Sequence, residues 1–289
     1  MLKRLYFSKG NAKLAKTTAI FSLPAGFSCP FAKVCRSCAA RDTGKITDGK
    51  DCKFRCYAVN AENLFPKVRA NRWRNWELLK EAKTVIGMAN LLESSLIAKR
   101  NIELVRFGQS GDFYNQAYFD AWLTVAKYHP EWTFYGYTKA LPYWVARLGS
   151  IPANFKLTAS QGGTHDHLIG DYKLRSAQVV FTEQAAADLG LEIDHDDTHC
   201  WKGDKDFAIL LHGTQPAGSE AGKAWYKIKN HGPGGYYADY FHHDAKKAKA
   251  KAAAKAKTVN VAAIKARWKF TPKVNDMRKV SAHRWVKTY

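Results

Sequence analysis

Apolar residues recur along the middle of the chain in two alternating patterns. Several stretches carry apolar side chains three and four positions apart, which indicates amphipathic helices. Between them lie short, continuously apolar segments, which indicate strands buried on both faces of a sheet. The predicted strands are 18–23, 102–107, 132–137, 155–160, 177–182 and 207–212, and the predicted helices are 75–101, 117–129, 141–149, 183–190 and 217–229.

Alternation of strands with helices predicts an α/β fold with a mainly parallel sheet. A closed eight-stranded barrel, a partial (β/α) barrel and an open sheet all satisfy this pattern. We expect residues 1–240 to form the barrel-like domain and residues 241–289 to form a Lys/Ala-rich basic tail.

Polar residues follow the predicted strands at their carboxyl ends. In α/β folds these ends meet at one rim, where ligands bind, so we expect a functional site there. The alternative is that these loops are polar only because they face solvent. The candidate catalytic residues are Asp112, Lys139 and His212, and the candidate cofactor-binding residues are Ser110, Gly111, Thr138 and Glu183.

The segment DHDDTHC at 194–200 mixes carboxylates, imidazoles and a thiol. His195 and His199 are four residues apart, which would place them on one face of a helix, with Cys200 adjacent. Together they could bind a second metal ion. The alternative is a polar loop whose aspartates cap a turn. The H-x-H at 165–167 has the same two interpretations.

The net charge is +21, and it is concentrated at the C-terminal end. Residues 246–289 hold 14 Lys and Arg against one acid, Asp276. Such a tail suits the phosphates of DNA or RNA, and its aromatic residues suit base stacking. The alternatives are a solubilising tail and a segment that packs back onto the domain.

Nothing in the sequence indicates contact with a membrane. No apolar run reaches the roughly 18 residues that a membrane-spanning helix needs. The basic N-terminal segment lacks the continuous apolar stretch and the small-residue cleavage site of a signal peptide. We therefore expect a reducing cytoplasm, where clustered cysteines more often bind metals than form disulfides.

Five of the six cysteines lie in the loop 28–58, with the spacing C-x5-C-x2-C-x13-C-x3-C. They are Cys29, Cys35, Cys38, Cys52 and Cys56. A zinc ion could be bound by two pairs of thiols, Cys35 with Cys38 and Cys52 with Cys56, in which case Cys29 would not be a ligand. An iron–sulfur cluster fits three cysteines, which leave one iron open to a substrate or cofactor. Disulfides are the third choice. Because the loop follows the strand 18–23 and opens onto the polar rim, a reactive cluster is favoured over a structural site.

Eight segments carry a resemblance to a known family. They are FSLPAGFSCPFAKVC (21–35), TGKITDG (43–49), FRCYA (54–58), VRANRWRNWELL (68–79), FGQSGDFYNQAYFDAW (107–122), FYGYTKALPYWV (134–145), VVFTEQAAADLGLEIDHDDTH (179–199) and LLHGTQPAGSEAGKA (210–224). These segments resemble the phage "gene product 88" domain family. The resemblance covers nearly everything up to about residue 230 and excludes the basic tail. A phage protein would act in the host cytoplasm.

The arrangement also looks like a second phage group, which has radical-SAM-like barrels. That group shares a cysteine loop ending in C-Y-A, a Ser and an Asp in a loop after a strand, and a strand leading into T-K. Here these features match residues 56–58, Ser110 with Asp112, and Thr138 with Lys139. The usual radical-SAM spacing C-x3-C-x2-C is absent, and the nearest match is C-x5-C-x2-C at 29–38.

The gene product 88 resemblance divides the five cysteines into two groups. It implies that Cys29, Cys35 and Cys56 hold the cluster, and we expect the 4Fe-4S type. S-adenosylmethionine or another small substrate would bind at its open site. It also implies that Cys38 and Cys52 are accessory, either paired with each other or adding ligands.

Three functions follow from these observations. The first is a radical-SAM-like iron–sulfur enzyme, for which the basic tail suggests nucleic acid or nucleotides as the substrate. The second is a non-enzymatic nucleic-acid-binding protein with a structural zinc or iron–sulfur site. The third is an electron-transfer protein. An enzyme of the first kind would also need an electron donor as a partner.

Overall fold

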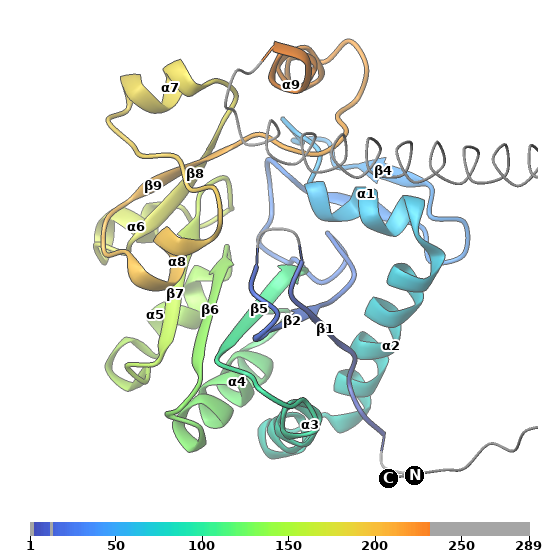
Figure 1. Ribbon diagram of the computed structural model, residues 1–289, viewed down its shortest axis with the longest axis vertical. Coiled ribbons are helices and arrows are strands. Elements are labelled where there is room, and N and C mark those ends of the chain that lie inside the picture. The colour runs from blue at the N-terminus through green and yellow to red at the C-terminus, as the bar shows by residue number, and fades with distance from the viewer. Residues whose placement is uncertain (1–2, 12–13, 232–289) are drawn as a thin grey trace, which may run out of the picture. The chain divides into compact units, whose positions relative to one another are not determined.

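The computed structural model describes residues 3–11 and 14–231, and within them seven strands form one central sheet (Figure 1). Its order is β1-β2-β5-β6-β7-β8-β9, with β1 antiparallel and each later pair parallel. The strands are β1 (Phe7–Lys9), β2 (Thr18–Ser22), β5 (Leu104–Ser110), β6 (Thr133–Thr138), β7 (Phe155–Ser160), β8 (Ser176–Val180) and β9 (Phe207–Leu210). The predicted α/β fold with a mainly parallel sheet is confirmed.

The parallel strands lie in the sheet in the same order as in the chain. This is the winding of a (β/α) barrel, whereas a doubly wound fold reverses its strand order near the middle. The sheet ends at β1 and β9, which do not pair with each other in the described part of the chain. The described sheet is therefore open, and the closed eight-stranded barrel is not formed.

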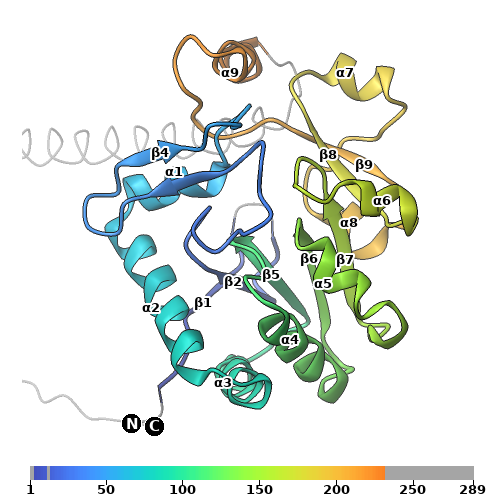
Figure 2. The ribbon, with the colours of Figure 1, turned by 180° about the vertical axis from the view of Figure 1, so that it is seen from behind.

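Helices cover both faces of this sheet (Figure 2). They are α1 (Tyr57–Leu64), α2 (Pro66–Ala82), α3 (Val85–Ile97), α4 (Gln116–Tyr128), α5 (Leu141–Val145), α6 (His167–Asp171), α7 (Glu183–Asp188), α8 (Thr198–Lys202) and α9 (Glu220–His231), with a 3-10 turn at Leu148–Ser150. A short hairpin, β3 (Ser37–Ala39) and β4 (Ile46–Asp48), forms a separate two-stranded sheet inside the cysteine loop.

The single helix predicted over 75–101 is wrong, because the chain turns sharply between α2 and α3. Lys83 has φ +56° and ψ −46°, and the N–H of Thr84 donates to the carbonyl of Ala82 at 2.6 Å. This is a γ-turn, and it ends α2. The Thr84 hydroxyl then accepts from the N–H of Gly87 and begins α3.

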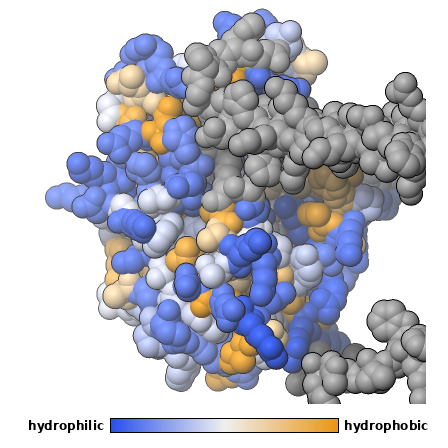
Figure 3. Space-filling model, in the orientation of Figure 1, coloured by the Kyte–Doolittle hydropathy of each residue, from blue (hydrophilic) through white to orange (hydrophobic). Residues whose placement is uncertain are grey.

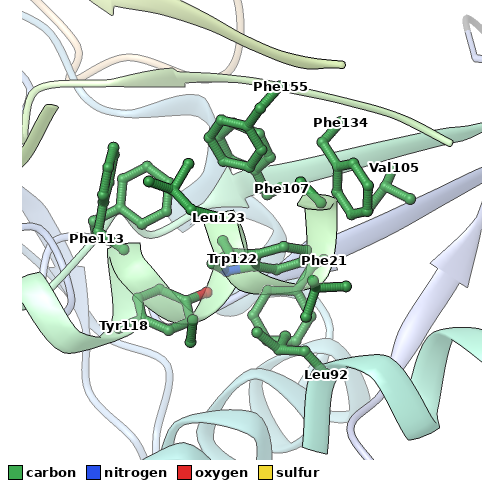
Figure 4. Packing of buried hydrophobic residues seen from close by; sticks show 14 of the residues in the cluster. Phe21, Leu92, Val105, Phe107, Phe113, Tyr118, Trp122, Leu123, Phe134 and Phe155 are labelled. Atoms are coloured by element: carbon green, nitrogen blue, oxygen red, sulfur yellow. The ribbon is translucent and has the colours of Figure 1, made fainter. Parts of the chain in front are cut away.

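The main hydrophobic core lies between the sheet and helices α2 to α5 (Figure 4). Trp122 of α4 is fully buried, and it contacts the rings of Phe21 and Phe107 from β2 and β5. Phe107 stacks on Phe155 of β7 with ring centroids 4.7 Å apart. Because aromatic rings bury large areas, this cluster fixes the strands on which the rim residues stand.

The opposite face of the sheet is covered by α8. Cys200 of α8 is fully buried and packs with Tyr135 of β6 and Phe207 of β9. Arg106 of β5 points to the same face and pairs with Asp197, just before α8, at 2.9 Å. The DHDDTHC segment therefore fills the inner side of the curved sheet.

Side-chain contacts at the carboxyl rim connect the loop after β9 with the end of the cysteine loop, which follows β2. The Gln215 side chain, beyond β9, accepts from the N–H of Arg55 at 2.7 Å and donates to its carbonyl at 3.0 Å. His212 packs on the ring of Tyr57 at the start of α1, with ring centroids 4.5 Å apart. The loop after the last strand thus contacts the end of the cysteine loop.

On the face shown in Figure 3, polar residues cover much of the surface and apolar residues form small separate groups. No helix within residues 3–11 and 14–231 is both long and apolar enough to cross a membrane. The predicted basic tail and its boundary at residue 241 lie outside the described residues.

Candidate functional site

Three of the clustered thiols influence one another electrostatically. Burial raises the pKa of the Cys29 thiol well above its ordinary value, and Asp112, Cys56 and Cys35 raise it further. Burial also raises the pKa of Cys56 to about 12, with Cys35 as the next contribution. These mutual effects require the three sulfurs to lie near one another. The structure therefore places the three thiols selected by the sequence resemblance within electrostatic range of one another, and it places Cys52 within range of Cys35 as well.

The other two thiols of the loop lie apart from each other. The Cys52 thiol contacts the Phe54 carbonyl at 3.0 Å and the Ser37 hydroxyl at 3.6 Å. Cys38 follows Ser37 on β3, so its side chain points to the other face of the hairpin. Burial raises the pKa of Cys38, and the neighbouring charges that act on it belong to Arg36 and Glu62. Of the two roles left open for Cys38 and Cys52, a disulfide between them is not formed in the structure, where both thiols are free.

Backbone hydrogen bonds hold the first half of the cysteine loop against the loop after β7. The N–H groups of Lys33 and Val34 both donate to the carbonyl of Gly162, at 3.2 and 3.0 Å. A side chain at position 162 would collide with Val34, and the φ of +94° there also favours glycine. Cys35 follows Val34 directly, so these bonds position its thiol on the rim.

Asp112 joins the carboxyl ends of β5 and β6. Its Oδ1 accepts from the Thr138 hydroxyl at 2.6 Å, and its Oδ2 accepts from the N–H of Lys139 at 2.8 Å. Burial raises the pKa of this carboxyl, and the hydrogen bonds oppose the shift without cancelling it. Three predicted rim residues are thus brought together, next to Cys29.

Lys139 extends the same connection to β7. Its ammonium group donates to the carbonyl and hydroxyl of Ser160, at 2.9 and 2.7 Å, and to the carbonyl of Gln161 at 2.6 Å. The side chain is buried, and three acceptors match its three N–H groups. Lys139 therefore positions the loop on which the cysteine segment docks.

A bulge at the end of β5 directs Ser110, Gly111 and Asp112 towards the rim. Ile20 pairs with Arg106 and Ser22 pairs with Ser110. Between these two pairs β5 advances by four residues and β2 by only two, so β5 bulges outward. These rim residues line a small pocket together with Leu23, Phe107, Gly108, Phe113, Tyr118 and Tyr137. Gly111 has φ +78°, and a side chain there would collide with Ser28 of the cysteine loop.

Sequence reasoning missed a buried ion pair beside the thiols. Glu62 of α1 is fully buried, and its Oε1 accepts from Arg72 of α2 at 2.7 Å and from the N–H of Ala25 at 2.8 Å. Arg72 also helps lower the pKa of Cys56. A Glu and an Arg ten residues apart look like ordinary surface charges in sequence. Their burial follows from the packing of α1 on α2 and the rim (Figure 1).

The gene product 88 family model matches residues 5–227, which include the cysteine loop, the rim and the bridging loop after β9. The chain belongs to the gene product 88 family. Among curated proteins, the gene 88 protein of Mycobacterium phage L5 is 29% identical over 140 residues, which cover 45% of this chain and 51% of that protein. The match thus spans about half of that relative's length. No solved structure matches the chain.

The thiol trio of this gene product 88 member offers suitable ligands for zinc or for an iron–sulfur cluster. Cys56 is the N-cap of α1, so the positive end of the helix dipole favours negative charge there. Arg72 and Lys139 act on Cys56 in the same direction. However, no three His, Cys, Asp or Glu side chains in the described residues are placed to hold a metal ion as they stand. Binding therefore requires the thiols to draw closer together.

Two other predicted rim residues lie outside this constellation. Glu183 is exposed in the first turn of α7, where Thr182 caps the helix. His212 packs on Tyr57, and its Nδ1 lies 3.1 Å from the Leu210 carbonyl, so it belongs to the contact between the loop after β9 and the end of the cysteine loop. Their proposed roles in catalysis and cofactor binding remain predictions.

The DHDDTHC segment does not have the helical arrangement that its spacing predicted. α8 begins only at Thr198, so His195 lies before the helix and does not share a face with His199. His199 hydrogen-bonds Asp194 and Glu192, at 3.2 and 3.0 Å. The Cys200 thiol is buried against the Thr158 hydroxyl. These contacts give the segment a structural role on the inner face of the sheet.

In the H-x-H at 165–167, His165 packs edge-on against Phe31 of the cysteine loop, with ring centroids 5.0 Å apart. Asp166 accepts from the N–H groups of Gly162 and Gly163, at 2.6 and 2.8 Å. This segment therefore supports the turn on which the cysteine loop docks.

Proposed function

We propose that this protein binds an iron–sulfur cluster of the 4Fe-4S type through Cys29, Cys35 and Cys56 and acts as a radical-SAM-like enzyme. The observation that carries the proposal is the gathering of these three thiols at the carboxyl rim of a parallel sheet wound as in a (β/α) barrel. Three protein ligands leave one iron open to a small molecule. The buried cationic groups near Cys56 suit a negatively charged cluster.

With the cluster bound, its open iron supplies one-electron chemistry at a small molecule, and S-adenosylmethionine is the class we favour. The chain's own residues orient the site. Asp112 fixes the ends of β5 and β6, and its raised pKa lets the carboxyl exchange a proton closer to neutral pH than an exposed aspartate does. Lys139 holds the loop beneath the cysteine segment.

Anaerobic purification followed by measurement of iron, acid-labile sulfide and visible absorbance tests the proposal. We expect iron and sulfide in equal stoichiometry and a brown protein. Formation of 5′-deoxyadenosine from S-adenosylmethionine, with a chemical reductant in place of the electron donor, tests the enzymatic part. A colourless protein that holds stoichiometric zinc would overturn the cluster assignment.

The strong positive charge favours a second candidate, a nucleic-acid-binding protein in which the metal site is structural. The observation behind it is the concentration of Lys and Arg in residues 246–289. Binding by this segment should weaken steeply with salt and disappear when the segment is removed. Absence of S-adenosylmethionine turnover together with such binding would favour this candidate over the enzyme.

A further inference from the structure

A group of aromatic rings lies on the outer side of α2, next to the cysteine loop. Phe27 packs against both Trp73 and Trp76, with ring centroids 4.7 and 5.2 Å apart. Arg41 lies over the Trp73 ring at 5.1 Å, and Lys80 lies over the Trp76 ring at 5.6 Å. We call these five residues the aromatic strip.

Two features of the local structure place the Phe27 ring on the solvent side of the two half-buried indoles. The indoles are three residues apart on α2, so they share one face of the helix. Phe27 follows Gly26, whose φ is +66° and whose position has no room for a side chain beside Ser37 and Cys38. The rigid turn presents Phe27 outward, and 52% of this residue is exposed. An apolar ring held outward in this way is available to a ligand.

The charges of the strip favour an anionic ligand with flat faces. A cation lies over each indole, and both cationic side chains are exposed. Glu77 pairs with Arg41, which offsets one of the two positive charges, so the net positive charge of the strip comes from Lys80. An apolar peptide or a second copy of this chain would have to cover these cations without neutralising them, at a desolvation cost.

We propose that the aromatic strip binds single-stranded nucleic acid, with a base stacking on Phe27 and phosphates contacting Arg41 and Lys80. Unpaired bases stack on aromatic side chains without sequence preference, whereas the bases of a duplex are already stacked on one another. This site is separate from the basic tail and does not depend on the cluster chemistry. It gives the described domain its own contact with a nucleic-acid ligand.

Fluorescence anisotropy with a short labelled oligothymidylate and an abasic strand of equal length tests the site in the full-length protein. The two strands carry the same phosphates, so electrostatic binding by the tail is alike for both. We expect the wild type to prefer the oligothymidylate by ~5- to 150-fold, the range for loss of one stacked base. This preference should persist at a salt concentration that weakens binding of the abasic strand.

The variant Phe27→Ala should show a smaller preference than the wild type, because only stacking on aromatic residues outside the strip is left, and it should still bind both strands through the tail. Lys80→Gln should weaken binding of both strands by a similar factor, because it removes a phosphate contact. Tyr128→Ala removes a more exposed aromatic residue at the end of α4 and serves as the matched control. The metal content of each variant shows whether the cysteine loop is intact. If Phe27→Ala loses metal, the test rests on Lys80→Gln, which should weaken the binding of both strands if the strip contacts phosphates.

Equal binding of the oligothymidylate and the abasic strand by the wild type would overturn the proposal. So would unchanged binding in both the Phe27→Ala and Lys80→Gln variants. A change of oligomeric state in Phe27→Ala, without a change in oligothymidylate binding, would assign the strip to a protein contact instead. None of these outcomes bears on the iron and sulfide content that tests the proposed cluster.

Discussion

The surroundings of Cys56 affect its thiol in two opposite ways, because burial favours the protonated thiol and nearby positive charge favours the thiolate. Burial raises its pKa to about 12, so a free thiol stays protonated at neutral pH. The N-terminus of α1 and the nearby Arg72 and Lys139 favour the thiolate. In the proposed cluster, a bound metal would replace the proton, and the same cationic groups would stabilise the thiolate.

Single Cys→Ser variants should separate ligands from accessory thiols. Replacing Cys29, Cys35 or Cys56 should remove most of the bound metal, since each supplies one of three protein ligands. Cys38→Ser is the matched control, and it should retain metal because Cys38 lies on the other face of the hairpin from Cys52. Metal analysis of the purified variants is the measurement, and metal loss from the Cys38 variant alone would contradict the assignment.

The raised thiol pKa values predict how the stability of the metal-free protein depends on pH. An unfolded thiol ionises near its ordinary value of 9.0, whereas Cys56 in the folded chain ionises at about 12. Between these values the unfolded state binds fewer protons, so the free energy of unfolding falls as pH rises. Urea unfolding under reducing conditions at about pH 8 and about pH 10 measures this.

Tyrosines also titrate in that range, so the Cys56→Ser variant provides the reference. It should lose less stability than the wild type over the same pH interval. Metal-loaded protein should lack this thiol contribution, since its thiolates are already formed. An identical pH response in the wild type and the variant would show that the Cys56 thiol is not buried in this way.

At the scale of elements, the turn between α2 and α3 is a strained point. Lys83 occupies φ +56°, a region that glycine reaches without steric cost. Lys83→Gly should therefore raise stability by about 1 kcal/mol, because relief of strain exceeds the added freedom of the unfolded chain. Thermal unfolding measures the effect, with Lys67→Gly in the first turn of α2 as the control. The control should lower stability, and a lower melting temperature for Lys83→Gly would refute the prediction.

Sequence periodicity located the parallel strands because each is continuously apolar. The strand predicted at 155–160 coincides with β7, the one at 18–23 ends one residue later than β2, and the one at 132–137 is shifted by one residue from β6. The turn at Lys83 could not be found, because neither Gly nor Pro marks it and both flanking helices share one apolar pattern. α1 was missed because its buried side includes the charged Glu62.

Part of the site was predictable because its residues follow the parallel strands. Residues after parallel strands meet at one rim whatever the details of the loops, so Asp112, Thr138 and Lys139 were correctly grouped. The choice of three thiols came from family resemblance, since spacing alone also allowed zinc pairs. The burial of Arg72 and the separation of Cys38 from Cys52 depend on tertiary packing that no local pattern encodes.

At the scale of the whole molecule, Gln215 connects the last strand to the cysteine loop. Gln215→Ala should leave the N–H and carbonyl of Arg55 without these partners and cost about 1–3 kcal/mol. It should also lower metal retention, because Arg55 immediately precedes Cys56. Gln184→Ala on the exposed side of α7 is the control and should be nearly neutral. Chemical denaturation and metal analysis report the two effects, and unchanged metal retention would show that the bridge is dispensable.

The hydrogen bonds between Gln215 and Arg55 also affect when the cysteine loop can reach its final structure during synthesis. The thiols emerge from the ribosome early, whereas Gln215 lies 160 positions after the residue that it holds. Closing so long a loop is entropically costly and must wait until the intervening strands are in place. The contact between Gln215 and Arg55 therefore cannot form until nearly the entire described domain has been translated. Insertion of the proposed metal would then be a late step, coupled to the docking of the final strand.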